Sequence, residues 1–248
     1  MRVSVVNFCS TALDMLKFST EMLRKFAGTD DYDYLVVTWN PSPDVQEYLD
    51  LHREIIQVAY QTDPQRAYVP NLRLMFNLGF DAGYLSNDYV CIVNTDMAFG
   101  RDWLKNLVLR TSEEIIPNSL HISPIKGRNI VTADFGIPTI GTFDLAGFWK
   151  LHDRLFSSKV ETVEDRGGWD ATQTMPYVVH RQWWEKCGPW RAEHIIGTEP
   201  PDRQFFRRIH EAGGKYILCH DSICYHHEAV ERRSKVRPIG IETMPEGV

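Results

Sequence analysis

The 248-residue sequence lacks the features that mark several classes of protein. No apolar run approaches the roughly 18 to 20 residues that a membrane-spanning helix needs, so we expect no transmembrane segment. Met1 leads directly into a strand-like stretch rather than into the charged and apolar regions of a signal peptide, which predicts a cytoplasmic protein. The chain also contains no internal repeat and no low-complexity block.

The chain also has no excess of positive charge and no even set of closely spaced cysteines. The formal net charge of −6 argues against a protein that binds by neutralising nucleic-acid phosphates, so nucleic acid is not an expected partner. The five cysteines are odd in number, lie far apart or in apolar stretches, and show no CxxC spacing. We therefore expect reduced, mostly buried thiols rather than disulfides.

The composition of the sequence is that of a globular domain. It is 43% hydrophobic and 24% charged, which fits a single domain over residues 1–248 with one sizeable core. In the first hundred residues, strand patterns alternate with helix patterns, and this alternation predicts a parallel, Rossmann-like half-sheet. The expected strands are 2–8, 34–39 and 89–94, and the expected helices are 13–26, 44–60 and 71–86.

The second part of the chain is less regular. We expect residues 126–142 to form loop and edge strand, and the polar, glycine-rich residues 161–168 to form a mobile loop. Further helices are expected at 103–115, 181–186 and 202–212, and further strands at 119–124, 177–180 and 216–219.

A polar motif ends the third expected strand. The apolar run Val90–Val93 is followed by Asn94, Thr95 and Asp96, whose side chains cannot lie unpaired inside a sheet. In open α/β sheets, ligands bind in the crevice outside the carboxyl ends of the strands, so Asp96 is placed to hold a metal or a polar ligand. The alternative is an ordinary turn in which Asp96 caps the next helix.

Four segments, in this order, resemble the family-two glycosyltransferases of the GT-A fold. The segments are Val36–Asn40, Asn71–Gly79, Asn94–Asp96 and Gly197–Arg208. The resemblance implies a three-layer α/β/α fold with a mainly parallel central sheet. It also implies a nucleotide-sugar-binding half at 1–100, an acceptor-binding half at 101–230 and a tail at 231–248. The sequence departs from the family pattern at Asn94, where the first Asp of DxD is usual, and at Pro200 in the EDxD-like motif.

The activity that the resemblance implies is metal-dependent transfer of a sugar from a UDP- or GDP-sugar to an acceptor hydroxyl, with inversion. Asp96 would be a ligand of Mn²⁺ or Mg²⁺. One imidazole near the end of the chain would complete the metal shell; strand alternation allows His226 or His227 but not both, and the resemblance favours His226. The candidate donor-site residues are Thr38, Asn40, Arg73, Asn77, Asn94 and Asp96.

Two carboxylates compete for the role of catalytic base. Inverting transfer needs a carboxylate that takes the proton of the acceptor hydroxyl, and the family places this base in the motif that contains Glu199 and Asp202. Asp202 retains the final acid of that motif and is the favoured base, although both acids also suit the capping of a helix. Trp169 and Asp170 follow two glycines and are the candidate acceptor-site residues.

Two other functions remain open from the sequence. A sugar nucleotidyltransferase would need a glycine-rich phosphate loop after the first strand, and Phe8–Thr11 is not such a loop. A carbohydrate-binding or nucleotide-sugar-binding protein without turnover would account for the departures at Asn94 and Pro200.

Overall fold

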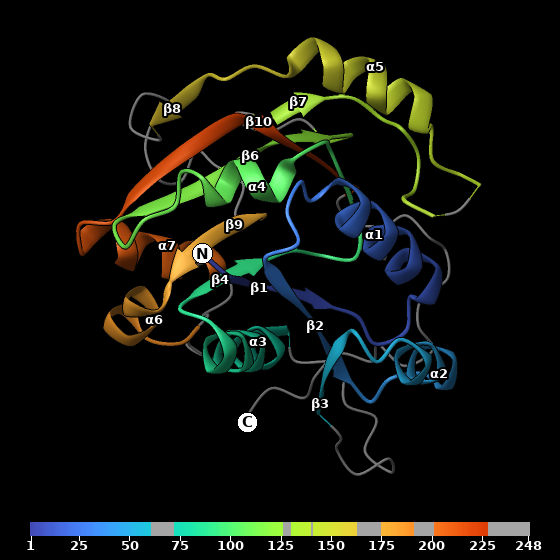
Figure 1. The fold of residues 1–248 in the computed structure, drawn as a ribbon, viewed down its shortest axis with the longest axis horizontal. Helices are drawn as coiled ribbons and strands as arrows, with labels where there is room; N and C mark the ends of the chain where they lie inside the picture. Colours follow the sequence, from blue (N-terminus) through green and yellow to red (C-terminus); the bar gives the residue numbers. More distant parts are fainter. Residues whose placement is uncertain (61–71, 126–129, 140, 163–174, 191–200, 228–248) are drawn as a thin grey trace, which may run out of the picture.

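A mixed sheet runs through the molecule in the computed structural model, which describes residues 1–60, 72–125, 130–139, 141–162, 175–190 and 201–227 (Figure 1). Within these residues the strand order is β3-β2-β1-β4-β9-β6-β10-β5, with β7 paired to β6 and β8 to β10. The strands are β1 Val3–Phe8, β2 Tyr32–Trp39, β3 Ile56–Tyr60, β4 Tyr89–Ile92, β5 Met97–Phe99, β6 Ile115–Ser123, β7 Ile130–Thr132, β8 Val160–Thr162, β9 Tyr177–His180 and β10 Lys215–His226.

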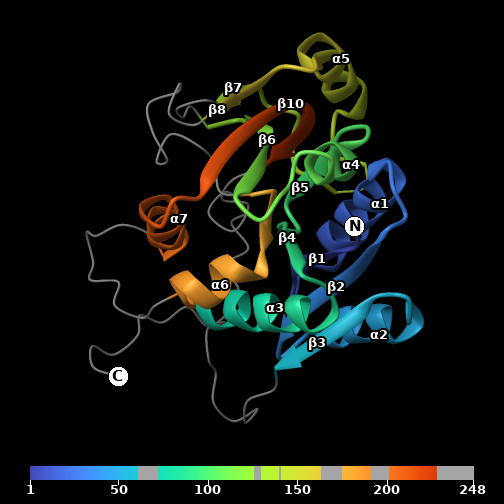
Figure 2. The same cartoon turned by 60° about the vertical axis from the view of Figure 1, so that its left-hand side comes forward.

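Helices flank this sheet. They are α1 Leu13–Phe26, α2 Pro43–Leu51, α3 Leu72–Ser86, α4 Trp103–Val108, α5 Leu145–Leu155, α6 Arg181–Cys187 and α7 Pro201–Glu211. Helix α3 packs on β1, β2 and β4. Helix α6 lies between α3 and α7 (Figure 2), where the ring of Trp184 stacks on Phe80 with centroids 4.4 Å apart.

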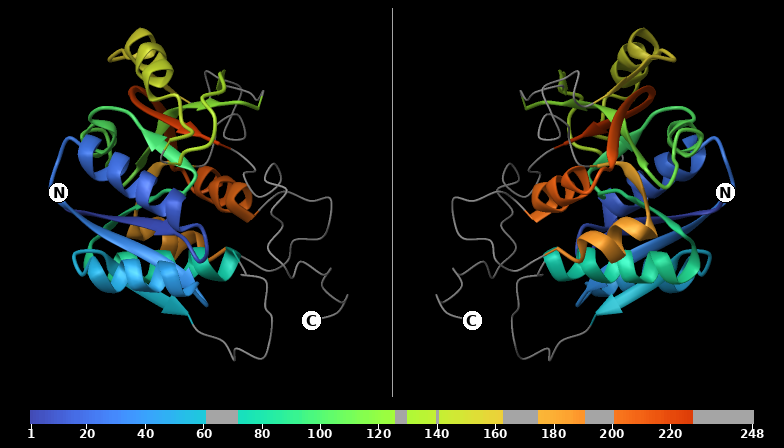
Figure 3. Two further views of the ribbon diagram at one scale, coloured as in Figure 1. Left: turned by 90° about the vertical axis from the view of Figure 1, so that its right-hand side faces the viewer. Right: turned by 90° about the vertical axis from the view of Figure 1, so that its left-hand side faces the viewer.

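The two halves of the sheet are joined through one antiparallel strand. Strands β3, β2, β1 and β4 are parallel to one another, and β6 is parallel to β10. Strand β9 pairs antiparallel with both β4 and β6 and so connects the two groups. Figure 3 shows the resulting arrangement, with β3 at one end of the molecule and β10 and α5 at the other. The predicted mixed α/β fold with a mainly parallel central sheet is confirmed.

Three expected elements differ from the structure. The helix expected at 44–60 ends at Leu51, and residues 56–60 form β3 beside β2. The helix expected at 103–115 ends at Val108, and Ile115 already begins β6. The last strand continues to His226 instead of ending at Cys219. Residues 56–60, 115 and 223–226 take their conformation from pairing with a neighbouring strand, and local periodicity does not contain that information.

Two expectations from composition can be checked directly. All five cysteines are reduced and buried, as predicted. In the part of the chain that the structure describes, no helix combines the length and apolarity that crossing a membrane would require.

Helix α3 approaches the sheet closely at its glycines. A Cβ atom added to Gly79 would lie 2.8 Å from Val6 Cγ1 and 3.0 Å from Phe8 Cε1. One added to Gly83 would lie 2.7 Å from Val90 Cγ2. Valine side chains are stiff in strands, so they cannot easily yield. The two glycines therefore set the distance between α3 and the strands β1 and β4.

We expect Gly79→Ala to lower the free energy of unfolding by about 1–3 kcal/mol, because the new methyl group overpacks the interface with β1. Helix propensity alone predicts the opposite sign, since alanine favours a helix over glycine by about 1 kcal/mol. Urea denaturation of Gly79→Ala and the wild type shows whether the free energy of unfolding falls or rises. Leu85→Ala, on the same helix at a side chain that is 88% exposed, is the control. A stabilised Gly79→Ala protein would contradict the close packing.

A buried histidine links α5 to β5. His152 is 1% exposed, and its ring occupies the space that a Cβ atom on Gly100 would need. Burial lowers the pKa of His152 below its usual value, although the hydrogen-bond contact with Asp153 (Nδ1 to Oδ1, 3.0 Å) opposes this in part. His152 therefore favours the neutral form in the folded protein.

This burial predicts a loss of stability in mild acid. Below about pH 6.5, the unfolded chain takes up a proton at His152 that the folded chain accepts only at lower pH, so the free energy of unfolding falls. We expect the melting temperature to fall between pH 7.5 and pH 5.5, and to fall less in His152→Leu than in the wild type. Identical pH dependence of the two proteins would contradict this origin.

Candidate functional site

The polar turn Asn94–Asp96 lies at the carboxyl ends of the parallel strands. Val93 N donates to Val6 O (2.9 Å), which extends the pairing of β4 with β1 up to the turn. Thr95 Oγ1 then donates to Phe8 O (3.2 Å), at the end of β1. The side chains of the turn are partly exposed, directly after a strand that is buried from Val90 onward. The turn therefore opens at the edge of the sheet where ligands bind in folds of this kind.

Asp96 faces His226 across this edge. The Asp96 Oδ1 and His226 Nε2 atoms are 3.1 Å apart, with side-chain exposures of 21% and 16%. The backbone fixes the pair, because His226 pairs with Met97 in the β5–β10 ladder and His227 N donates to Asp96 O (3.0 Å). Residues 130 positions apart in the sequence are thus held together by strand pairing rather than by a flexible loop.

His227 has a different environment from His226. Its ring is buried and lies nearly parallel to that of Tyr225, with centroids 6.4 Å apart. The Tyr225 hydroxyl donates to Gly136 O (2.9 Å), so this side of β10 packs against the loop before α5. Of the two histidines, His226 is the one whose ring meets Asp96.

The Asp96–His226 pair has the dimensions of two neighbouring metal ligands. Oxygen ligands surround Mg²⁺ octahedrally at about 2.0–2.1 Å, which places adjacent donor atoms about 3 Å apart. A carboxylate oxygen and an imidazole nitrogen also suit Mn²⁺. Among the described residues, no group of three His, Cys, Asp or Glu side chains is arranged to hold a metal. The residues therefore fit a cation that takes its remaining ligands from water or from a bound substrate.

The end of β2 lies beside the end of β1 on the same edge. Thr38 is buried, and its hydroxyl accepts a hydrogen bond from Gln57 Nε2 (3.3 Å) on β3. Asn40 follows the strand with a φ of 44° and is partly exposed. Of these two predicted donor-site residues, Asn40 presents the more accessible side chain, together with the partly exposed Asn94 in the turn after β4.

Asn77 makes a contact that the sequence did not suggest. Its amide Nδ2 donates to Trp190 O (3.1 Å), and its Oδ1 accepts from Trp190 N (2.9 Å). The ring of Phe76 stacks on Trp190 with centroids 4.1 Å apart and meets the ring of Phe8 at a tilt with centroids 4.2 Å apart. Through these bonds, Asn77 holds the segment that follows α6 against α3. A contact between Asn77 and a nucleotide stays a prediction.

The remaining predicted site residues lie mostly in the second half of the chain. Asp202 is partly exposed in the first turn of α7, a helix anchored to the sheet by Phe206, whose ring is 4.7 Å from that of Tyr177. Arg73 lies in the first turn of α3. Glu199, Trp169 and Asp170 lie outside the described residues.

One histidine near the site was missed by the sequence analysis. His121, on β6, is 2% exposed, and its ring is perpendicular to that of His226 at a centroid distance of 6.2 Å. Burial lowers the pKa of His121 well below its usual value, which favours the neutral ring. The available signal was a single histidine within the apolar stretch Leu120–Ile122, which more often indicates a packed core residue.

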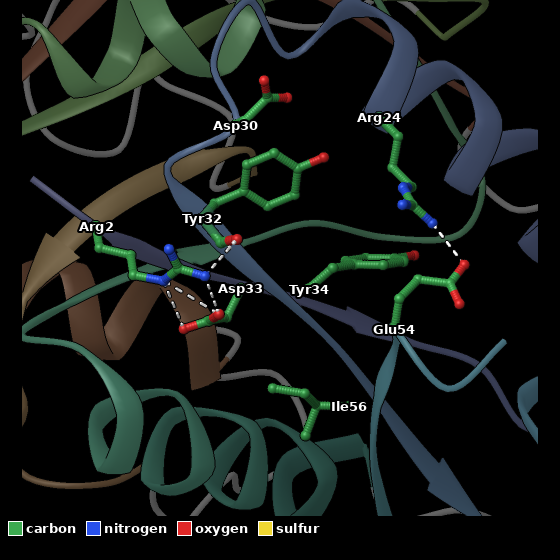
Figure 4. Close-up of a pocket in the computed structure, with 8 residues that line it drawn as sticks. All are labelled: Arg2, Arg24, Asp30, Tyr32, Asp33, Tyr34, Glu54 and Ile56. Carbon is green, nitrogen blue, oxygen red and sulfur yellow. Dashed lines mark hydrogen bonds and ion pairs between the residues drawn. The ribbon is translucent and has the colours of Figure 1, made fainter.

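A concave pocket lies at the opposite ends of β1, β2 and β3, away from the polar turn. Figure 4 shows Arg2 turned toward Asp33 and Arg24 turned toward Glu54, and these ion pairs measure 2.6 and 2.8 Å. The charges at this pocket are therefore largely satisfied by one another.

Three known structures resemble this chain in their fold. GalNAc-T7 with UDP, GalNAc and Mn²⁺ matches 90% of this chain at 12% identity, with a TM-score of 0.60. TarS of S. aureus in complex with UDP matches 92% at 12% identity, also with a TM-score of 0.60. The mannosyltransferase PcManGT of Pyrobaculum calidifontis, in complex with GDP-Man and Mn²⁺, matches 94% at 14% identity, with a TM-score of 0.57.

The chain has the GT-A glycosyltransferase fold. It spans 43%, 60% and 58% of the lengths of these three structures, respectively. No protein-family model matches the sequence, and no curated protein does. At 12–14% identity, the likeness concerns the GT-A fold, and the roles of individual residues follow from their own chemistry.

If Asp96 and His226 hold the cation, we expect Asp96→Ala and His226→Ala each to weaken Mn²⁺ binding in the presence of UDP at least about tenfold, because each variant would lack one of the two candidate ligands. Isothermal titration of Mn²⁺ into the protein with UDP measures this. Glu54→Ala is the matched control, since Glu54 forms a similar carboxylate–imidazole pair with His52 (3.2 Å) at the opposite ends of the strands. Unchanged Mn²⁺ affinity in Asp96→Ala would rule out the metal role.

Proposed function

We propose that this chain is a metal-dependent, inverting glycosyltransferase domain that moves a sugar from a nucleoside-diphosphate sugar to an acceptor hydroxyl. The observation that carries the proposal is the Asp96–His226 pair, at 3.1 Å, on the carboxyl edge of a GT-A sheet. The presence of UDP or GDP-Man with Mn²⁺ in two of the similar structures supports the same ligand chemistry here. The donor is a UDP- or GDP-sugar, and the cation is Mn²⁺ or Mg²⁺.

Asp96 and His226 would hold the cation next to the diphosphate. A divalent cation neutralises the charge that develops on the diphosphate as it leaves. Because Asn94 replaces a second carboxylate, the turn carries only one negative charge, and the diphosphate itself must contribute oxygen ligands. We therefore infer that the protein binds the cation much more strongly when the nucleotide is present.

The donor nucleotide would occupy the edge formed by the ends of β1, β2 and β4. Asn40 and Asn94 are partly exposed there and offer amide groups that can hydrogen-bond the nucleoside. Arg73 would pair with phosphate, for which a guanidinium is suited. Thr38 is buried and would act by holding the end of β2 through its bond with Gln57. Asn77 would orient the chain at Trp190.

Asp202 is the proposed base of the transfer. In a direct displacement, the acceptor oxygen forms a bond to the anomeric carbon while the bond from that carbon to the diphosphate oxygen breaks, and the anomeric configuration inverts. The carboxylate of Asp202 takes the proton of the attacking hydroxyl. Glu199 is the alternative base, and Trp169 and Asp170 are proposed to contact the acceptor. We also propose that the chain resembles family-two enzymes in its activity and that the group it transfers is a hexose.

Incubation with UDP- and GDP-hexoses and Mn²⁺, followed by measurement of released UDP or GDP, tests the activity. We expect release with at least one donor, its stimulation by simple sugar acceptors, and its loss when EDTA removes the cation. Release from no donor, with or without acceptors, would contradict the proposed function.

We expect Asp202→Asn to lower turnover about 10²- to 10⁴-fold, because it removes the proton acceptor, and to leave UDP affinity within about twofold. Glu211→Gln is the matched control, since Glu211 is an exposed acid on the same helix that pairs with Arg207 (3.1 Å). Full activity of Asp202→Asn together with inactive Glu199→Gln would assign the base to Glu199.

A further inference from the structure

His121 stands out as a buried polar side chain that the proposed mechanism does not use. It is 2% exposed, and neither of its ring nitrogens has a hydrogen-bond partner among the described residues. A neutral imidazole carries one donor and one acceptor nitrogen, so two hydrogen-bonding groups are left without a partner. Buried polar groups in native proteins are nearly always paired, and an unpaired one calls for an explanation.

The position of His121 in the sheet offers an explanation for its unpaired nitrogens. In the parallel ladder of β6 and β10, His121 pairs with Cys224, and His226 is the next residue of β10 on the same face of the sheet. The two rings are perpendicular, with centroids 6.2 Å apart. His226 in turn is 3.1 Å from Asp96. The imidazole of His121 therefore lies next to the ring of His226, which itself contacts Asp96.

His121 is not arranged as a third metal ligand, since the described residues contain no group of three metal-binding side chains. We propose instead that one of its ring nitrogens hydrogen-bonds to an oxygen ligand of the cation held by Asp96 and His226. That oxygen belongs either to a water molecule or to the diphosphate. The inference rests on the proposed function, and it makes His121 a ligand-binding residue of the same site.

The choice of histidine at this position supports the assignment. The residues on either side, Leu120 and Ile122, are buried and apolar, so an apolar ring of similar shape would suit the interior at least as well.

The test compares His121→Phe, His121→Asn and His121→Gln with the wild type. Asn places a polar group near the position of Nδ1, and Gln places one near Nε2. Melting temperatures without ligand report on packing. Calorimetric titration with Mn²⁺ alone, and then with UDP in saturating Mn²⁺, reports on the two sources of the oxygen ligand. His152→Leu is the control for the loss of a buried histidine outside the site.

For His121→Phe, we expect an unchanged or higher melting temperature together with at least fivefold weaker ligand binding, and recovery of binding in His121→Asn or His121→Gln. Weakened binding of Mn²⁺ alone identifies the oxygen as water, and weakened binding of UDP only identifies it as diphosphate. Wild-type affinity for both ligands in His121→Phe would overturn the inference. Equal loss in all three variants, with lowered melting temperatures, would also overturn it. Absence of binding by the wild type would overturn the proposed function itself.

Discussion

The site depends on the antiparallel pairing of β5 with β10. Strand β5 is only three residues long, yet its ladder places Met97 opposite His226 and so brings Asp96 next to that imidazole. The hydrogen bond from His227 N to Asp96 O (3.0 Å) extends the pairing to the acid itself. Without this short ladder, the carboxylate of Asp96 in the turn after β4 would not lie beside the imidazole of His226.

The rest of the fold supports this pairing from both sides. The parallel strands β1 and β4 hold the start of the turn, through the bond from Thr95 Oγ1 to Phe8 O, and α3 packs close to both strands at Gly79 and Gly83. On the far side, β10 pairs with β6 on both sides of a register shift between Cys219 and Ile223. The parallel strands β1 and β4 and the antiparallel pair β5–β10 therefore meet at the turn Asn94–Asp96.

Much of this architecture could be predicted from the sequence, because several segments carry strong local signals. The helix expected at 71–86 shows an apolar face, and α3 occupies Leu72–Ser86; residues 177–180 form β9 as expected. Strand β3 was missed because its five residues gain their conformation from pairing with β2. At the site, the sequence located Asp96 and favoured His226. It could not reveal His121 or the bonds of Asn77, because both depend on contacts between residues 105 or more positions apart.

The central claim is that Asp96 and His226 together hold a divalent cation beside a nucleoside diphosphate. Pulsed EPR of Mn²⁺ bound with UDP, in protein labelled with ¹⁵N-histidine, tests this directly because it detects nitrogen bonded to the metal. The account predicts the coupling of one directly coordinated imidazole nitrogen, absent in His226→Ala and retained in His227→Ala. Absence of any directly coordinated histidine nitrogen in the wild-type complex would contradict it.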